Sequence, residues 1–122
     1  FTVIASAQTA GRGRHGRCWM SEPGAGLYFS HARSFAHAHG GMQALSLVTA
    51  LATVQALNAL GAAGLKLKWP NDVLHSGRKL AGILLERRDR LGSVWIVFGI
   101  GINLQLSDGQ RRVLDRPVCD LS

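Results

Sequence analysis

The feature that most constrains the fold is a nearly continuous apolar run from Val94 to Leu104. A run of this length is typical of a central, buried strand in a sheet. Gly99 and Gly101 stand two residues apart within it, so they share one face of the predicted strand. That face is left as a groove, which suits either a bound ligand or a close contact with a helix, and periodicity does not choose between them.

Shorter β-rich segments are expected to complete the sheet at residues 2–7, 27–32, 65–69, 73–75 and 79–86. The first two are predicted to run antiparallel. Ser76-Gly77 predicts a tight hairpin turn between the last two. Gly82 interrupts an apolar strand, which indicates that another group, such as a ligand, approaches the backbone there.

One long helix is expected between about Met42 and Leu60, where apolar residues surround a narrow polar stripe of Ser46, Thr49 and Thr53. We expect it to be largely buried and to end at Gly61. The predicted fold class is therefore α+β, with a mixed, mostly antiparallel sheet covered on one face by a long buried helix.

Glycine and arginine alternate in the stretch Gly11-Arg12-Gly13-Arg14-His15-Gly16-Arg17-Cys18-Trp19. Glycines allow sharp turns and close approach to a ligand, and guanidinium groups bind anions. Because the stretch lacks apolar periodicity and lies between two predicted strands, it is expected to be a loop. We expect it to be mobile when empty and to act as a lid over a charged ligand.

The chain has 122 residues and a formal net charge of +7, which predicts one domain with an anionic partner. Nucleic acid, phosphate and carboxylate ligands all qualify. A second basic cluster, Arg87, Arg88 and Arg90, is expected in a solvated turn. A nucleic-acid-binding module is disfavoured because only Tyr28 and Phe29 form an aromatic pair, without interleaved basic residues.

Several features bear on location and metal binding. Cys18 and Cys119 are expected to be reduced thiols, and no signal peptide or run of about 18 apolar residues is seen, so a cytoplasmic protein without a membrane partner is expected. His37 and His39, near His31, have the spacing of a weak metal site, although surface histidines are the expected outcome.

The remaining polar signals lie at strand ends. Lys66 and Lys68 lead into an Asn71-Asp72 corner, which could hold a metal ion or a ligand hydroxyl, and Lys79 opens the next strand. No catalytic Ser-His-Asp or Cys-His arrangement and no G-x-x-x-x-G-K-[ST] phosphate loop is present. Together with the glycines and the arginine loop, these residues fit a flat apolar ligand with an anionic end.

Four motifs occur in a family order: the glycine–arginine loop with Trp19, Lys68-Trp69-Pro70-Asn71-Asp72, Lys79-Leu80-Ala81-Gly82-Ile83-Leu84, and Gly99-Ile100-Gly101-Ile102-Asn103. In these motifs the chain resembles the catalytic domain of biotin-protein ligases. The resemblance implies the class II synthetase-like fold of biotin and lipoate ligases. It also implies that residues 1–122 form part of a catalytic domain truncated at both ends, without the family's C-terminal β-barrel or N-terminal DNA-binding domain.

The resemblance further implies a two-step reaction. Biotin and ATP, with Mg²⁺, give biotinyl-5′-adenylate, and the biotinyl group then passes to a lysine of a biotin carboxyl carrier protein. Arg12 and Lys79 match the catalytic positions. Biotin-binding positions are matched by Gln8, Gly11, Arg12, Lys79, Gly82, Leu84, Gly99 and Gly101. Positions that bind ATP or the adenylate are matched by Arg14, Arg17, Trp19, Asn71 and Asn103, and Asp72 is the candidate metal ligand.

Two alternatives remain open at this point. A lipoate-protein ligase would share the adenylate chemistry, and a basic nucleic-acid-binding module would explain the charge. DNA is expected as a partner only if the parent protein has a separate DNA-binding domain, and a homodimer is also compatible with the sequence.

Overall fold

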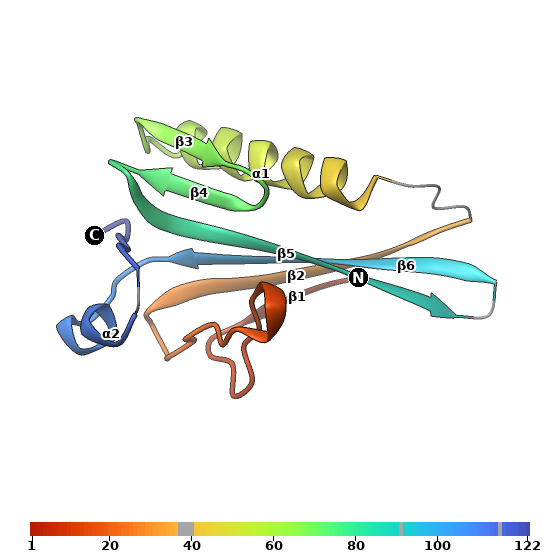
Figure 1. Ribbon diagram of the computed structural model, residues 1–122, viewed down its shortest axis with the longest axis horizontal. Helices are drawn as coiled ribbons and strands as arrows, with labels where there is room; N and C mark the ends of the chain where they lie inside the picture. Colours follow the sequence, from red (N-terminus) through yellow and green to blue (C-terminus); the bar gives the residue numbers. More distant parts are fainter. Residues whose placement is uncertain (37–40, 91, 115) are drawn as a thin grey trace.

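The computed structural model describes residues 1–36, 41–90, 92–114 and 116–122. Six strands, one long helix, one short helix and a single 3₁₀ turn make up the described part (Figure 1). The strands are β1 (Thr2–Ala5), β2 (Gly26–Phe35), β3 (Leu65–Lys68), β4 (Asp72–His75), β5 (Arg78–Arg90) and β6 (Ser93–Asn103). The helices are α1 (Met42–Ala59) and α2 (Asp108–Val113), and the 3₁₀ turn spans Arg14–Gly16.

The strands form one sheet in the order β1-β2-β6-β5-β4-β3, and each neighbouring pair is antiparallel. The apolar run that includes Gly99 and Gly101 is β6, which pairs along its length with β2 and β5. β1 and β2 run antiparallel as predicted, and the turn before β5 places Ser76 and Gly77 at φ angles of 49° and 74°. The α+β class and the predominantly antiparallel sheet are confirmed.

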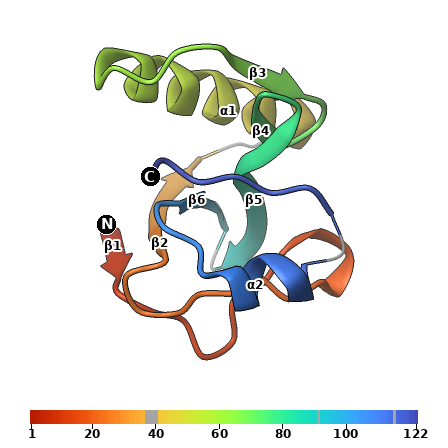
Figure 2. The ribbon, with the colours of Figure 1, turned by 90° about the vertical axis from the view of Figure 1, so that its left-hand side faces the viewer.

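Alternation along the central strands separates two faces of the sheet. Ile100 and Ile102 of β6 pack in the core with α1, whereas Gly99, Gly101 and Asn103 belong to the opposite face. Figure 2 shows α1 on one side of the sheet and the loop before β2, together with α2, on the other. The chain therefore has one face for packing and one face open to a ligand.

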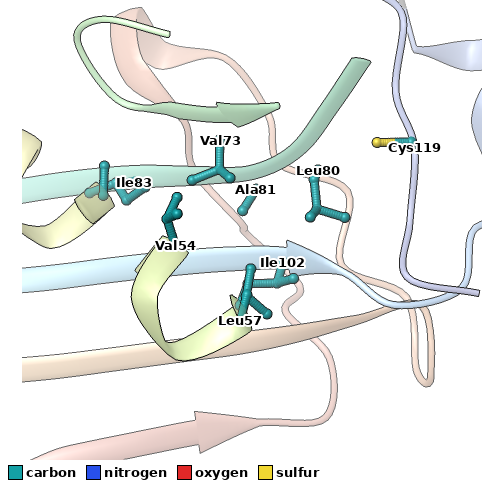
Figure 3. Packing of buried hydrophobic residues seen from close by; sticks show 9 residues of the cluster. Val54, Leu57, Val73, Leu80, Ala81, Ile83, Ile102 and Cys119 are labelled. Atoms are coloured by element: carbon teal, nitrogen blue, oxygen red, sulfur yellow. The ribbon is translucent and has the colours of Figure 1, made fainter. Parts of the chain in front are cut away.

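The core lies between α1 and strands β4, β5 and β6 (Figure 3). Its cluster comprises Ala50, Val54, Leu57, Val73, Leu80, Ala81, Ile83, Ile102 and Cys119. Val73 and Ala81 are fully buried and Leu80 is 1% exposed. Removal of this apolar surface from water is the main force that holds α1 on the sheet.

The structure corrects the predicted burial of α1. The helix covers one face of the sheet, but only Ala50, Thr53, Val54 and Leu57 are buried. The predicted polar stripe lies on the more buried side of the helix: Thr53 is 6% exposed, and the Ser46 hydroxyl donates to the Pro70 carbonyl at 3.3 Å. The Thr53 hydroxyl is satisfied within the helix, where it donates to the Thr49 carbonyl at 2.8 Å. Large apolar side chains on the other side are exposed, namely Leu47, Val48, Leu51 and Leu60.

By length and composition alone, α1 is long and apolar enough to cross a membrane. The expectation from sequence concerned an uninterrupted run of about 18 apolar residues, and α1 is not such a run, because polar residues such as Ser46, Thr49 and Thr53 interrupt it. A single such helix is weak evidence for a span, since the core helix of a soluble protein passes the same test. The contacts of α1 with β3, β4 and β5 are those of a helix packed on a sheet.

Two other segments differ from expectation. Arg87, Arg88 and Arg90 belong to β5, not to a turn, because β5 continues its pairing with β6 to the register Arg90–Ser93. Beyond residue 105, where no element was predicted, the chain forms α2. Its capping box consists of the Ser107 side chain and Gln110, each of which bonds the other's backbone amide.

Candidate active site

The glycine–arginine loop is a closed hairpin between β1 and β2. The Trp19 amide donates to the Gly11 carbonyl at 2.9 Å, and the Gly13 amide donates to the Arg17 carbonyl at 2.7 Å. A short 3₁₀ turn forms the tip, with His15 in the left-handed region at φ 58°. The segment is a loop as predicted, and its base is fixed by backbone hydrogen bonds.

The side chain of Trp19 packs the loop against the open face of the sheet. A methyl group at Gly101 would lie 2.6 Å from Trp19 Cε2, and one at Gly82 would lie 2.8 Å from Trp19 Cζ3. The indole thus rests on a surface that only glycine provides at both positions. The predicted groove is therefore partly filled by a side chain of the protein itself, while the space beside Gly99 meets only Leu84.

Lys79 lies at the edge of this surface and pairs with Asp72. The Lys79 ammonium is 2.7 Å from Asp72 Oδ1, and the side chains are 12% and 19% exposed. The ammonium also lies 5.2 Å from the centre of the Trp19 ring. Burial lowers the pKa of Lys79, the pairing with Asp72 partly opposes that shift, and the nearby guanidinium groups of Arg116 and Arg17 lower the pKa further.

Arg12 is also paired with a carboxylate. Its Nη2 lies 3.0 Å from Oε2 of Glu86, and Arg88 Nη2 lies 3.2 Å from Oε1 of the same residue. Glu86 is not one of the predicted site residues. Its position two and four residues after Leu84 and Gly82, on the same face of β5, is the signal that could have identified it.

The two predicted asparagines, Asn71 and Asn103, form hydrogen bonds with the backbone around the cavity. Asn71 Nδ2 donates to the Ile83 carbonyl at 2.9 Å, and Arg14 reaches Asn71 Oδ1 at 3.4 Å. Asn103 is 8% exposed, and its amide donates to the Cys119 and Lys79 carbonyls at 2.9 and 3.3 Å. Both side chains therefore bond to the protein backbone beside the site.

A cavity of about 690 Å³ lies between the loop, the open face of the sheet and the C-terminal segment. It is lined by every predicted site residue except Gly11: Gln8, Arg12, Arg14, Arg17, Trp19, Asn71, Asp72, Lys79, Gly82, Leu84, Gly99, Gly101 and Asn103. Gly11 is buried in the loop base, where a methyl group would lie 2.4 Å from the Trp19 carbonyl oxygen.

The C-terminal segment supplies a wall that the sequence analysis missed. The Lys79 amide donates to the Pro117 carbonyl, and the Cys119 amide donates to the Lys79 carbonyl, both at 3.0 Å. Cavity-lining residues from this part of the chain are Leu106, Val113, Leu114, Arg116 and Val118. The capping pattern Ser107-x-x-Gln110 is the one local signal that could have indicated an ordered element here.

No group of three His, Cys, Asp or Glu side chains that could hold a metal occurs among the described residues. His31 forms a 2.8 Å hydrogen bond with Thr2 Oγ1. His37 and His39 lie outside the described residues. In the described part of the chain, two carboxylates line the cavity, Asp72 and Glu86, and both are paired with cations of the protein: Asp72 Oδ1 with Lys79, and Glu86 with Arg12 and Arg88.

Comparison with known families decides the relationship. A family model described as "Biotin/lipoate A/B protein ligase family" matches residues 1–103. The chain belongs to this family. Curated relatives include the bifunctional ligase/repressor BirA of Escherichia coli, which is 40% identical over 114 residues, covering 93% of this chain and 36% of the relative. The biotin–[acetyl-CoA-carboxylase] ligase of Paracoccus denitrificans is 47% identical over 107 residues, 84% of this chain and 43% of the relative.

Solved structures of the family share the fold. The biotin protein ligase of Aquifex aeolicus in complex with biotin and ATP has a TM-score of 0.78 and 32% identity, over 98% of this chain and 49% of that one. The Leishmania major enzyme with biotinyl-5-AMP has a TM-score of 0.79 and 28% identity, over 99% and 52%. This member of the biotin/lipoate ligase family thus spans about half or less of these relatives' length.

Proposed function

We propose that this chain provides the site at which a biotin-protein ligase activates biotin with ATP. One observation carries the proposal: Arg12 and Lys79 line the same cavity as the glycine face of β5 and β6. The cavity therefore combines two cationic side chains with an apolar surface formed by glycines. Relatives that bind biotin and ATP or biotinyl-5-AMP give independent support.

The first step requires two anions to meet. A carboxylate oxygen of biotin attacks the α-phosphorus of ATP, and the bond from that phosphorus to the β-phosphate oxygen breaks to release pyrophosphate. Two unit charges about 4 Å apart repel by roughly 4 kcal/mol at an effective dielectric of about 20. Arg12 and Lys79 are the residues that would offset this repulsion, since their charges are fixed before the substrates arrive.

The apolar part of biotin would lie along the sheet. Gly99 lies close against Leu84, whose carbonyl oxygen would be 3.1 Å from an added Cβ. Gln8 stands at the loop base, where its Oε1 accepts from the Ser21 hydroxyl at 2.7 Å. The loop residues Arg14, Arg17 and Trp19 would cover the adenylate, with Asn71 and Asn103 behind it. Such a cover would keep water from the mixed anhydride. Bound Mg²⁺, with Asp72 as its protein ligand, would neutralise phosphate charge.

In the second step, a lysine amine of a carrier protein attacks the biotinyl carbonyl carbon. The bond from that carbon to the AMP oxygen breaks, and the nitrogen loses a proton to give the amide. A biotin carboxyl carrier protein is the acceptor that we propose. A cytoplasmic location and a homodimer remain predictions of the sequence.

A lipoate-protein ligase is the second candidate, because the family model spans both biotin and lipoate ligases. The direct test is mass-spectrometric detection of the acyl-adenylate after incubation with ATP, Mg²⁺ and either biotin or lipoate. Biotinyl-5′-adenylate without lipoyl-adenylate supports the proposal. The reverse pattern would assign the chain to the lipoate branch.

Substitution of the two cations tests the assigned roles. Arg12→Ala and Lys79→Ala should each reduce adenylate formation by at least about 100-fold, the usual scale for loss of one electrostatic contact in a transition state. Lys66→Ala is the matched control, since Lys66 is an exposed lysine outside the cavity. Pyrophosphate release that stays at the wild-type rate in both variants would contradict the assignment.

A further inference from the structure

We propose that Glu86 is a positioning residue: its carboxylate ties Arg12 to strand β5 and thereby holds the glycine–arginine loop over the site. The inference rests on the proposed function and extends it to a residue outside the family motifs considered above. Glu86 lies on the cavity side of β5 and lines the cavity together with Arg12.

The geometry is that of a tether between distant parts of the chain. Arg12 and Glu86 are 74 residues apart in sequence, and their contact distance is 3.0 Å. The second carboxylate oxygen of Glu86 accepts from Arg88 Nη2 at 3.2 Å. One carboxylate thus bridges an arginine of the loop and an arginine of its own strand, and its orientation is fixed from two sides.

The tether acts at the base of the loop. Arg12 forms an isolated antiparallel bridge with Cys18, which directly precedes Trp19. Trp19 contacts the glycine face at Gly82 and Gly101, and Arg12 contacts Glu86 four residues further along β5 than Gly82. The loop is therefore attached to the sheet at two points, one apolar and one ionic.

The pair is too exposed to contribute much to global stability. The side chain of Arg12 is 61% exposed and that of Glu86 is 24% exposed, and ion pairs at such positions contribute little to the free energy of unfolding. Loss of Glu86 should therefore change the position of the loop without unfolding the protein. This makes local and global effects separable by experiment.

The test compares Glu86→Gln with two matched controls in the full chain. Asp89→Asn removes another carboxylate of β5 that pairs with an arginine at 3.0 Å outside the cavity, and Arg88→Gln removes the second partner of Glu86. The first readout needs no substrate: trypsin cleavage after Arg14 and Arg17, which are exposed in the loop. The second is the KM for biotin and for ATP.

We expect Glu86→Gln to raise the cleavage rate about threefold or more, because loss of the tether increases the population of the open loop. KM should rise with a smaller change in kcat, whereas partial unfolding would lower kcat at constant KM. Arg12→Gln should raise the rate of cleavage after Arg14 and Arg17 by the same factor as Glu86→Gln. The double variant Arg12→Gln, Glu86→Gln should be cleaved no faster than either single variant. Asp89→Asn should remain near the wild type. Arg88→Gln should have a smaller effect than Glu86→Gln, because it removes one contact that orients Glu86 and leaves the contact between Glu86 and Arg12 in place.

Equal cleavage and equal KM in Glu86→Gln and Asp89→Asn would overturn the proposal. The same holds if Arg12→Gln and Glu86→Gln have additive effects on cleavage. Because cleavage is measured without substrate, it still decides the role of Glu86 if the wild type forms no adenylate. In that case the proposed function fails independently.

Discussion

Gly101 lies where Trp19 of the glycine–arginine loop contacts the sheet, and a methyl group added there would clash with the indole. Its missing side chain is replaced by the Trp19 indole, whose nearest atom would be 2.6 Å from an added Cβ. The same ring also lies against Gly82 and within 5.2 Å of the Lys79 ammonium, so a shift of the ring away from Gly101 would alter these contacts. The glycine therefore serves closure of the loop as well as room for a ligand.

Gly101→Ala is expected to displace Trp19 and weaken adenylate formation, since forced overpacking costs about 1–3 kcal/mol. The fluorescence of Trp19, isolated in a Trp69→Phe, Trp95→Phe background, should shift towards that of an exposed indole. Gly13→Ala is the control, because an added Cβ there lies 3.5 Å from its nearest neighbour. An unchanged Trp19 spectrum in Gly101→Ala would disprove the contact.

Lys79 predicts the direction of the pH dependence. Burial lowers its pKa, so the ammonium loses its proton at a lower pH than an exposed lysine would. Adenylate formation should fall as pH rises through this lowered pKa. Lys79→Arg should move that alkaline loss to higher pH, because arginine stays charged. The pH profile of pyrophosphate release checks this, and an identical alkaline limb in both proteins would assign it to another group.

The same lowered pKa of Lys79 makes the free energy of unfolding change with pH in the direction opposite to activity. Between the lowered pKa of Lys79 and its ordinary value, the unfolded chain binds more protons than the folded chain. The contribution of Lys79 to the free energy of unfolding therefore increases as pH rises through that interval. Activity and stability should thus respond in opposite directions to alkaline pH at this residue.

At the scale of elements, the C-terminal segment completes the cavity and depends on Asp120. Its Oδ2 accepts from the Leu106 amide at 2.7 Å and from Arg111, and Oδ1 accepts from the Ser122 hydroxyl. Burial raises the pKa of Asp120, but these hydrogen bonds and Arg111 outweigh it and leave the pKa below its ordinary value. The stabilisation is present above the unfolded pKa and is lost as pH falls through the folded one.

Asp120→Asn should lower the free energy of unfolding by about 1–3 kcal/mol, the usual range for disturbing a buried, charged hydrogen-bond acceptor. Urea unfolding at neutral pH measures this change. The difference from the wild type should shrink in acid, where Asp120 is protonated. Asp89→Asn, in an exposed pair, should have an effect of at most about 1 kcal/mol.

The elements that sequence could predict are those with a local signal. Alternation and a Ser-Gly turn define the hairpin of β4 and β5, and the apolar run defines β6. The orientation of α1 was not predictable from its pattern, because hydroxyls such as that of Thr53 bond within the helix and can face a core. The C-terminal end of β5 extends to Arg90 because the strand pairs with the adjoining strand β6 as far as Arg90–Ser93, where the sequence predicted a turn.

The residues of the candidate site also fall into those that the sequence could predict and those that it could not. Residues of the motifs, such as Arg12 and Lys79, were predicted to share one surface, and both line one cavity. Glu86 and Arg116 had no motif, and their place beside those cations depends on strand register and on the return of the C-terminal segment. The sequence can place Glu86 on the same strand face as Gly82 and Leu84, but its pairing with Arg12 and the approach of Arg116 to Lys79 are tertiary contacts.

At the scale of the whole molecule, the side of α1 that faces away from the sheet is exposed in this chain, which spans about half or less of its relatives' length. Val48 is 61% exposed and Leu51 is 48% exposed, on the side away from the sheet. Exposed apolar patches of this kind promote association or aggregation. The formal net charge of +7 opposes association through mutual repulsion.

Leu51→Glu should therefore reduce self-association of the chain and change the free energy of unfolding by no more than about 0.5 kcal/mol, as is usual for surface substitutions. Sedimentation velocity over a range of protein concentrations and salt checks the first expectation. In the wild type, added salt should increase association because it screens the positive charge. Identical sedimentation of Leu51→Glu and the wild type would exclude the α1 face as the cause.

The alternation of β6 has a consequence for mutational libraries. Ile100 and Ile102 belong to the packing side, while Gly99 and Gly101 belong to the cavity side. Odd and even positions of one strand are thus two separate sets of sites for selection. Randomising the even positions should act mainly on thermal tolerance, and randomising the odd positions should act mainly on the shape of the cavity, so the two traits could be evolved in separate rounds.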